Sequence, residues 1–402
     1  MKRIFYLIML SSFSLMLAQP NIKFGGFIKT DVMYDTRQTV SAREGHFLLY
    51  PAAESLDKNN EDKNAVPNFN MLSIQTRVNA KIDGIELIGG KVTGFIEAEF
   101  FGSTNDVTNG VRMRHAFIDY NFDNTKILVG QTWHPFFQTE SFPDVISFNT
   151  GVPFQPFARS PQIKLTQKFS DFQLTLAVNS QRDFPSYGVD NQPASTYLRN
   201  SGIPEATLGL QYKDENLMIG TMANYKTLRP RLENPLSKIK SEDDISSIGT
   251  TAYLKFTSGK FQFKTQGTYG GNLSDLMFIG GYADKYIDST TIEYTAGNMM
   301  AGWVELMYKD EFEYAIFAGY TQNLGTDDNS LAGKVYGRGT NINQIMRISP
   351  RICYNYGKTK TALELEYTQA CFGKIDNSDK SLVKDAVTVA NLRILLAFYL
   401  FL

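Results

Sequence analysis

Hydrophobic and polar residues alternate along many short segments, and this alternation is the most regular feature of the chain. The segment FQLTLAVN (172–179) carries large apolar side chains at every second position. The segment TALELEYT (361–368) repeats the pattern, with Glu364 and Glu366 at its polar positions. A period of two residues is that of a β-strand with one face in apolar surroundings and the other in water.

Sixteen segments of this kind follow one another, separated alternately by tight turns and by long polar connections. An even number of antiparallel strands with this alternation of connections is typical of bacterial outer-membrane barrels. We therefore predict an all-β fold, a sixteen-stranded antiparallel transmembrane β-barrel with short periplasmic turns and long extracellular loops. The predicted strands are 22–35, 70–82, 92–101, 111–121, 125–132, 160–169, 171–181, 203–213, 215–225, 246–258, 260–270, 298–309, 311–322, 342–356, 358–370 and 387–402.

A soluble β-sandwich would also show alternating strands, and the N-terminus separates the two interpretations. The stretch MKRIFYLIMLSSFSLMLAQ has two early basic residues, an apolar run and Ala18 before a polar segment, which is the layout of a secretory signal peptide. We predict a signal peptide at 1–18 and a single outer-membrane barrel domain at 19–402, in the bacterial outer membrane. Met16 departs from the small residue expected near a cleavage site, so an uncleaved anchor helix is the alternative.

Charge and cysteine content narrow the function. The chain has 40 basic and 41 acidic residues, a balance that gives no reason to expect a nucleic-acid partner. Cys353 and Cys371 are its two cysteines, too few for a disulfide framework or a cysteine-built zinc site. We expect Cys353 to face Ala362 across a hairpin, about 30 Å from Cys371, and both thiols to be free. We expect no cofactor and no metal site.

The segment VRMRHAFIDY (111–120) carries the first candidate chemistry. Strict alternation turns Arg112 and Arg114 toward a water-filled lumen. It also places His115 and Phe117 on the outer face, where a histidine suits a subunit interface better than lipid.

The same alternation turns other charged side chains inward. Arginines that face carboxylates across a narrow lumen create a transverse field and favour anions that a guanidinium can hold with two hydrogen bonds. The alternative is that these charges only solvate a wide channel. We predict a passive diffusion channel for small hydrophilic solutes with a modest preference for anions, and no catalysis. The further inward residues are Lys29, Arg77, Lys164, Arg347, Arg351 and Arg393, with Glu97 and Glu99 among the acids.

The connection at 133–159 differs from the other long ones because it is rich in Phe and Pro and has few charges. Such a segment is poorly suited to a water-exposed surface, so we predict that it folds into the barrel as a constriction loop. An ordinary surface or subunit-contact loop is the alternative. The loop also contains His134, Ser141 and Asp144, the residue types of a hydrolase site, which is the enzymatic alternative.

The amino-acid sequences of the first six predicted strands are similar to those of a known family. The segments GGFIKTDVMYDT, QTRVNAKI, GFIEAEFFG, VRMRHAFIDY, KILVGQTW and RSPQIKLTQ, within residues 22–180, resemble the DcaP-like trimeric outer-membrane porins. The resemblance implies a homotrimeric porin for small anions such as dicarboxylates, with Arg77, Arg112, Arg114 and Arg159 lining the constriction. The expected partners are small anionic solutes, outer-membrane lipid and lipopolysaccharide. A structural or adhesive barrel whose extracellular loops bind a partner is the alternative function.

Overall fold

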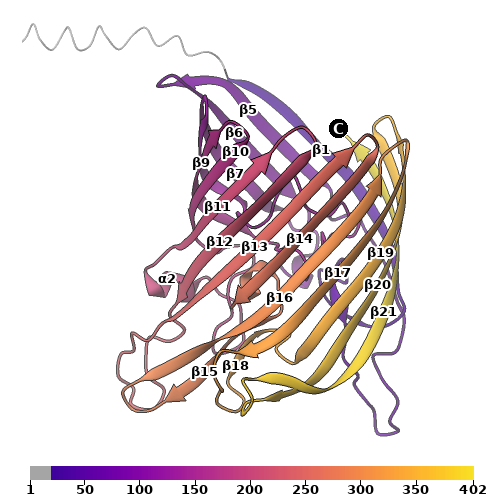
Figure 1. Ribbon diagram of the computed structural model, residues 1–402. Coiled ribbons are helices and arrows are strands. Elements are labelled where there is room, and N and C mark those ends of the chain that lie inside the picture. The colour runs from indigo at the N-terminus through magenta and orange to yellow at the C-terminus, as the bar shows by residue number, and fades with distance from the viewer. Residues whose placement is uncertain (1–19) are drawn as a thin grey trace, which may run out of the picture.

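A computed structural model describes residues 20–402, which form a closed antiparallel barrel (Figure 1). The predicted signal peptide at 1–18 lies outside the described residues. Strand β1 (Asn21–Asp35) pairs with β21 (Leu382–Phe401) on one side and with β5 (Arg77–Leu87) on the other. This pairing of the first strand with the last closes the sheet on itself, as a membrane-spanning sheet requires.

Nineteen strands form this one sheet, and sixteen of them make up the circumference of the barrel. Strand β4 (Asn68–Leu72) prolongs β5, while β15 (Gly280–Ile287) and β18 (Val335–Arg338) extend the wall beyond one rim (Figure 1). The predicted sixteen-stranded barrel is therefore confirmed. Its other wall strands are β6 (Gly90–Glu99), β7 (Arg112–Phe122), β8 (Thr125–Trp133), β9 (Arg159–Phe169), β10 (Phe172–Asn179), β11 (Glu205–Lys213), β12 (Leu217–Leu228), β13 (Ile245–Ser258), β14 (Phe261–Gly271), β16 (Ile292–Tyr308), β17 (Phe312–Thr326), β19 (Ile342–Tyr356) and β20 (Thr359–Asp376).

The two faces of the wall follow the alternation of the sequence. On β21, Phe398 and Leu400 point outward and are 46% and 45% exposed, whereas Leu395 and Ala397 point inward and are buried. Such a band of outward apolar side chains is the lipid-facing surface of an outer-membrane barrel.

The two rims differ in the length of their connections. Turns of two residues, such as 123–124 and 170–171, lie at the rim near the C-terminus, which the barrel class assigns to the periplasm (Figure 1). The long connections at the other rim hold three short helices. Of the helices in residues 20–402, none has the length and apolarity to cross a membrane. The helices are η1 (Asn105–Val107), α2 (Thr196–Ser201) and η2 (Ser274–Leu276).

The connection between β1 and β4 was predicted to be a long polar extracellular loop, and this prediction is wrong in part. It contains a hairpin of β2 (Thr39–Ala42) and β3 (Phe47–Pro51), and every residue of β3 is buried. The apolar segment FLLYP explains the difference, because its side chains leave water by packing inside the barrel.

The cysteine prediction is confirmed. Cys353 lies opposite Ala362 in the β19–β20 hairpin, while Cys371 lies opposite Gln344 nearer the extracellular rim, and both are free thiols.

Candidate functional site

Strand β7 contains a β-bulge that changes the face of the residues after it. Glu97 lies opposite His115, but the next residue of β6, Ala98, lies opposite Met113. Arg114 is therefore the extra residue of the bulge, which shifts the alternation after it by one position.

The predicted outward orientation of His115 and Phe117 is wrong for this reason. His115 is 6% exposed, with Nδ1 at 3.1 Å from Thr132 Oγ1 and Nε2 at 3.9 Å from Glu97. Phe117 lines a cavity inside the barrel. The suggestion of a subunit interface at His115 depended on an outward orientation and is therefore also wrong.

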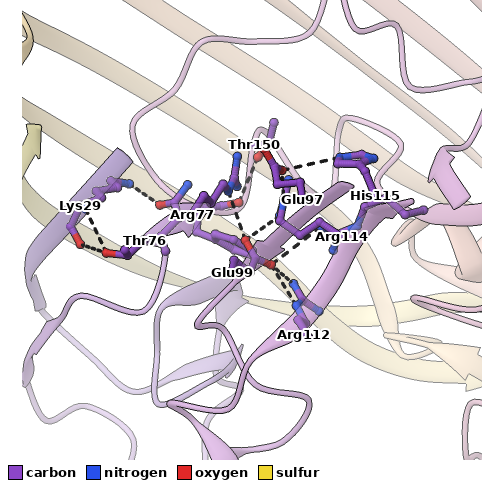
Figure 2. Close-up of polar contacts among 12 residues, drawn as sticks. Lys29, Thr76, Arg77, Glu97, Glu99, Arg112, Arg114, His115 and Thr150 are labelled. Atoms are coloured by element: carbon purple, nitrogen blue, oxygen red, sulfur yellow. Dashed lines mark hydrogen bonds and ion pairs between the residues drawn. The ribbon is translucent and has the colours of Figure 1, made fainter. Parts of the chain in front are cut away.

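Arg112 and Arg114 converge on carboxylates of the neighbouring strand β6. Arg114 donates to Glu97 at 2.7 Å and to Glu99 at 2.7 Å, and Arg112 donates to Glu99 at 2.6 Å (Figure 2). Bonds between a guanidinium and a carboxylate are charge-assisted and fix both side chains, which gives this part of the wall a defined electrostatic pattern.

Two further predicted arginines join the same group. Arg77 Nε lies 3.2 Å from Glu99, and Arg159 Nη1 lies 3.8 Å from it. Glu99 is fully buried, and four guanidinium groups lie within 4 Å of its carboxylate. The structure therefore brings together six of the predicted site residues: Arg77, Arg112, Arg114, Arg159, Glu97 and Glu99.

We call this group of residues the arginine cluster. It has two further members that were not predicted from the sequence. Asp183, in the connection after β10, accepts from Arg159 Nε at 2.7 Å and from Arg112 Nη1 at 3.3 Å. Arg43, at the tip of the β2–β3 hairpin, donates to the carbonyl of Gly102 at 2.7 Å and stacks on Phe101. Both lie in connections without alternation, so no signal in the sequence tied them to the wall.

The arginine cluster is electropositive. Its five guanidinium groups face three carboxylates, those of Glu97, Glu99 and Asp183, which leaves two positive charges in excess. Burial, followed by the charge of neighbouring Arg112, lowers the pKa of Arg43 to about 10. A guanidinium that feels this field from its neighbours is still charged at neutral pH.

Solvent reaches the cluster through two of its arginines. The side chains of Arg77 and Arg112 are 19% and 14% exposed, whereas those of Arg114 and Arg159 are 2% and 1% exposed. Arg77 and Arg114 also line a cavity of about 350 Å³ together with Trp133 and Thr150. A solute in the lumen would therefore meet Arg77 and Arg112 directly, and the buried arginines would act on it through their charge.

The connection between β8 and β9 lies inside the barrel and packs on the wall opposite the cluster. The Ile146 amide donates to Glu364 at 2.6 Å, and the Asp144 amide donates to Glu305 at 3.0 Å. Trp303 Nε1 donates to Gln155 at 2.6 Å. We call residues 134–158 the inner loop, and these bonds to strands β16 and β20 hold its polar backbone away from water.

Most of the predicted arginines on β19 and β21 hold inward-folded segments in place. Arg347 donates to the carbonyls of Val152 and Leu49, each at 2.8 Å. Arg393 donates to Gly45 at 2.7 Å and pairs with Asp35 at 2.7 Å.

Arg351 and Lys29 complete this anchoring set. Arg351 pairs with Glu305 at 2.8 Å, and Lys29 Nζ donates to the carbonyl of Ile146 at 2.7 Å. The interpretation of these residues as pore-lining needs correction, because inner segments cover them and leave each at most 5% exposed. The residues concerned are Lys29, Arg347, Arg351 and Arg393.

An aromatic core joins the inner loop to the β2–β3 hairpin. Phe47 contacts Phe148 and Phe157, with ring centroids 5.3 and 5.2 Å apart, and Phe101 stacks on Phe148 at 3.9 Å. Burial of these rings stabilises both segments within the lumen, which they narrow.

The three residues of the hydrolase alternative do not form a catalytic arrangement. His134 lies 3.5 Å from Glu205, the Ser141 hydroxyl lies 3.4 Å from the carbonyl of Leu254, and Asp144 pairs with Lys264 at 2.9 Å. Each side chain thus has a separate partner, and nucleophilic catalysis requires mutual contacts among them.

Comparisons with known proteins agree with this architecture. Residues 13–193 match the family model described as DcaP outer membrane protein. The crystal structure of the outer membrane channel DcaP of Acinetobacter baumannii is similar, with 17% identity, a TM-score of 0.69 and coverage of 95% of this chain and 97% of that one. A search of curated proteins finds no match.

Two other solved barrels share the fold. OmpT of Vibrio cholerae, folded in vitro and in its trimer form, has 10% identity, a TM-score of 0.56 and coverage of 95% and 99%. An anion-selective porin from Comamonas acidovorans has 9% identity, a TM-score of 0.55 and coverage of 96% and 100%. The resemblance to the DcaP family is thus confirmed over residues 13–193, and the chain has the fold of an outer-membrane β-barrel.

Proposed function

We propose that this outer-membrane porin is a passive diffusion channel for small hydrophilic solutes, with a preference for anions set by the arginine cluster. The observation that carries the proposal is the excess of two positive charges in the cluster, together with the partial exposure of Arg77 and Arg112. An electropositive constriction attracts anions and repels cations of the same size.

The carboxylates of the cluster have a role in release. A site that held an anion too tightly would block the channel, since conduction needs binding weak enough for departure. Three carboxylates, those of Glu97, Glu99 and Asp183, neutralise three of the five positive charges of the cluster. They also orient the guanidinium groups toward the lumen. Exchange of hydration water for guanidinium hydrogen bonds then favours entry without trapping the solute.

Small dicarboxylates are the anions that we propose as substrates. Arg77 and Arg112 lie on separate strands on either side of β6, so two exposed guanidinium groups are available to one solute. A solute with two carboxylates can use both, while the inner loop limits its size. The preference of the DcaP-like family, implied by the resemblance, supports the same substrate class.

We further propose that residues 1–18 are removed on export, that 19–402 form a single barrel domain, and that three copies associate. Support for the trimer comes from the resemblance and from the trimer form of the Vibrio cholerae barrel. Outer-membrane lipid and lipopolysaccharide would surround the outward apolar face.

The proposal can be tested in planar bilayers by measuring the reversal potential across a KCl gradient. We expect anion preference in the native protein and, in Arg112→Gln, a permeability ratio of chloride to potassium lower by about two- to fivefold, the effect of a partly screened charge. Lys91→Gln, which neutralises an exposed lysine at the periplasmic rim, is the matched control and should leave the ratio unchanged. Cation preference in the native protein would contradict the proposal, and a silent bilayer would favour an adhesive barrel.

A further inference from the structure

A second cavity inside the barrel lies on the periplasmic side of the inner loop. It has a volume of about 270 Å³ and is lined by Lys126 and Lys164, by threonine and glutamine side chains, and by Trp133 and Phe137. Trp133 and Phe137 also line the cavity beside Arg77, and their rings stack with centroids 3.9 Å apart. The stacked pair is thus the wall between the two cavities.

The charges of this second cavity leave one cation without a partner. Lys126 pairs with Asp119 at 2.8 Å, and Glu140, which also lines the cavity, pairs with Lys213. Lys164 forms no ion pair with any residue among 20–402 and is only partly buried. Its ammonium group is therefore a free positive charge at the cavity surface.

Hydrogen-bond donors line the same cavity as this ammonium. Thr166 follows Lys164 on the same face of β9, about 7 Å further along, and lies opposite Thr175 of β10. Gln173 is the next inward residue of β10. Within the described part of the chain these three side chains make no side-chain hydrogen bonds, so two hydroxyls and an amide remain available. A cation beside several free donors suits an oxyanion, because each of its oxygens can accept a bond.

We propose that Lys164 forms the centre of a second anion site, which takes a small oxyanion such as inorganic phosphate or the carboxylate of a small solute. The inference rests on the proposed function, since it places this site in series with the arginine cluster. Arg159 and Lys164 belong to the same strand and are separated by about 16 Å along it. An anion that leaves the cluster toward the periplasm would next meet a weaker site built on one ammonium, on the periplasmic side of the Trp133–Phe137 pair.

The test measures block of single-channel KCl current by inorganic phosphate added to each side in turn. We expect Lys164→Gln to raise the half-blocking phosphate concentration about five- to tenfold, as loss of one charge-assisted bond in partly hydrated surroundings implies. Lys164→Arg should keep the native value to within about twofold. Lys91→Gln is again the matched control, because Lys91 is an exposed lysine at the periplasmic rim and lies outside the cavity lining.

Equal phosphate block in Lys164→Gln and Lys91→Gln would overturn the second site. Native protein without anion preference in the KCl gradient would overturn the proposed function instead, so the two failures are distinct. If Lys164→Gln does not fold into a heat-modifiable barrel, Thr175→Val provides a second variant, and phosphate block unchanged from the native protein would again count against the site.

Discussion

The two sides of the lumen carry similar numbers of charges, and they differ in what covers them. On the side of β5 to β9, five arginines meet three carboxylates, and Arg77 and Arg112 remain accessible to solvent. On the side of β14 to β21, the charged groups that face the inner loop and the β2–β3 hairpin are buried, as Glu305, Arg347 and Arg393 illustrate.

This difference shows that an inward charge can serve a channel in two ways. An accessible guanidinium can interact with a solute, whereas a covered one such as Arg347 satisfies the carbonyls of Val152 and Leu49. A buried charge without partners is costly, and each of the covered groups forms ion pairs or bonds to the loop backbone. The anchoring side thereby determines how much of the lumen is left for the arginine cluster.

Removal of one anchoring carboxylate should have the largest effect. Glu305 is fully buried and contacts Lys264 at 2.7 Å, Arg351 at 2.8 Å and the Asp144 amide. Glu305→Ala removes the shorter of the two ion pairs of both Lys264 and Arg351 inside the barrel, and we expect a loss of about 3–5 kcal/mol of unfolding free energy. Urea unfolding in lipid vesicles measures it.

Comparison with Arg112→Gln would then sharpen the contrast between the two sides. Arg112→Gln should change the anion selectivity and lower the unfolding free energy by less than about 1 kcal/mol, because Arg112 is partly exposed and Glu99 keeps other partners. Glu215→Ala, in an exposed periplasmic turn, is the control for Glu305→Ala. Native stability of Glu305→Ala would show that the loop is held by other contacts.

A smaller effect is expected where the inner loop packs on a wall glycine. A β-carbon added at Gly319 would lie 2.4 Å from Cγ of Phe154 and would displace this ring from the wall. We expect Gly319→Ala to cost about 1–3 kcal/mol by overpacking and to increase current fluctuations as the loop loosens. Gly267→Ala, whose β-carbon would meet no atom within 4 Å, is the matched control. Identical unfolding of the two variants would contradict close packing of Phe154 on β17.

The smallest effect concerns acid pH. Burial acts to raise the pKa of Asp144, but the ammonium groups of Lys264 and Lys309 outweigh it and hold this pKa below the ordinary value. A carboxyl with a lowered pKa in the folded state stabilises the loop above about pH 4, the ordinary aspartate value, and this stabilisation is lost as pH falls further.

Between pH 5 and pH 3, Asp144→Asn should therefore lose less unfolding free energy than the native protein. The difference between the two losses should be below about 1 kcal/mol, because the Asp144 side chain is 33% exposed. Thermal unfolding of both proteins at the two pH values measures the difference. Asp123→Asn, in an exposed turn, controls for general acid effects. An equal loss in Asp144→Asn and the native protein would exclude this contribution.

The sequence by itself determined the class of fold, because a strand in a membrane barrel must alternate between lipid and lumen. That rule alone places Phe398 and Leu400 outside and turns Arg77, Glu364 and Arg393 inward. The tight turn at 357–358, which is also visible in the sequence, set the register that puts Cys353 opposite Ala362 and keeps the two thiols apart.

Only the tertiary structure decided which inward charges meet the solute. One extra residue at Arg114 reverses the faces of His115 and Phe117, and a bulge of this kind leaves no trace in hydrophobic periodicity. Arg43 and Asp183 reach the arginine cluster from connections whose path depends on packing across the barrel. Alternation reports the face of the wall that a side chain occupies, whereas its exposure depends on segments far away in sequence that fold over it.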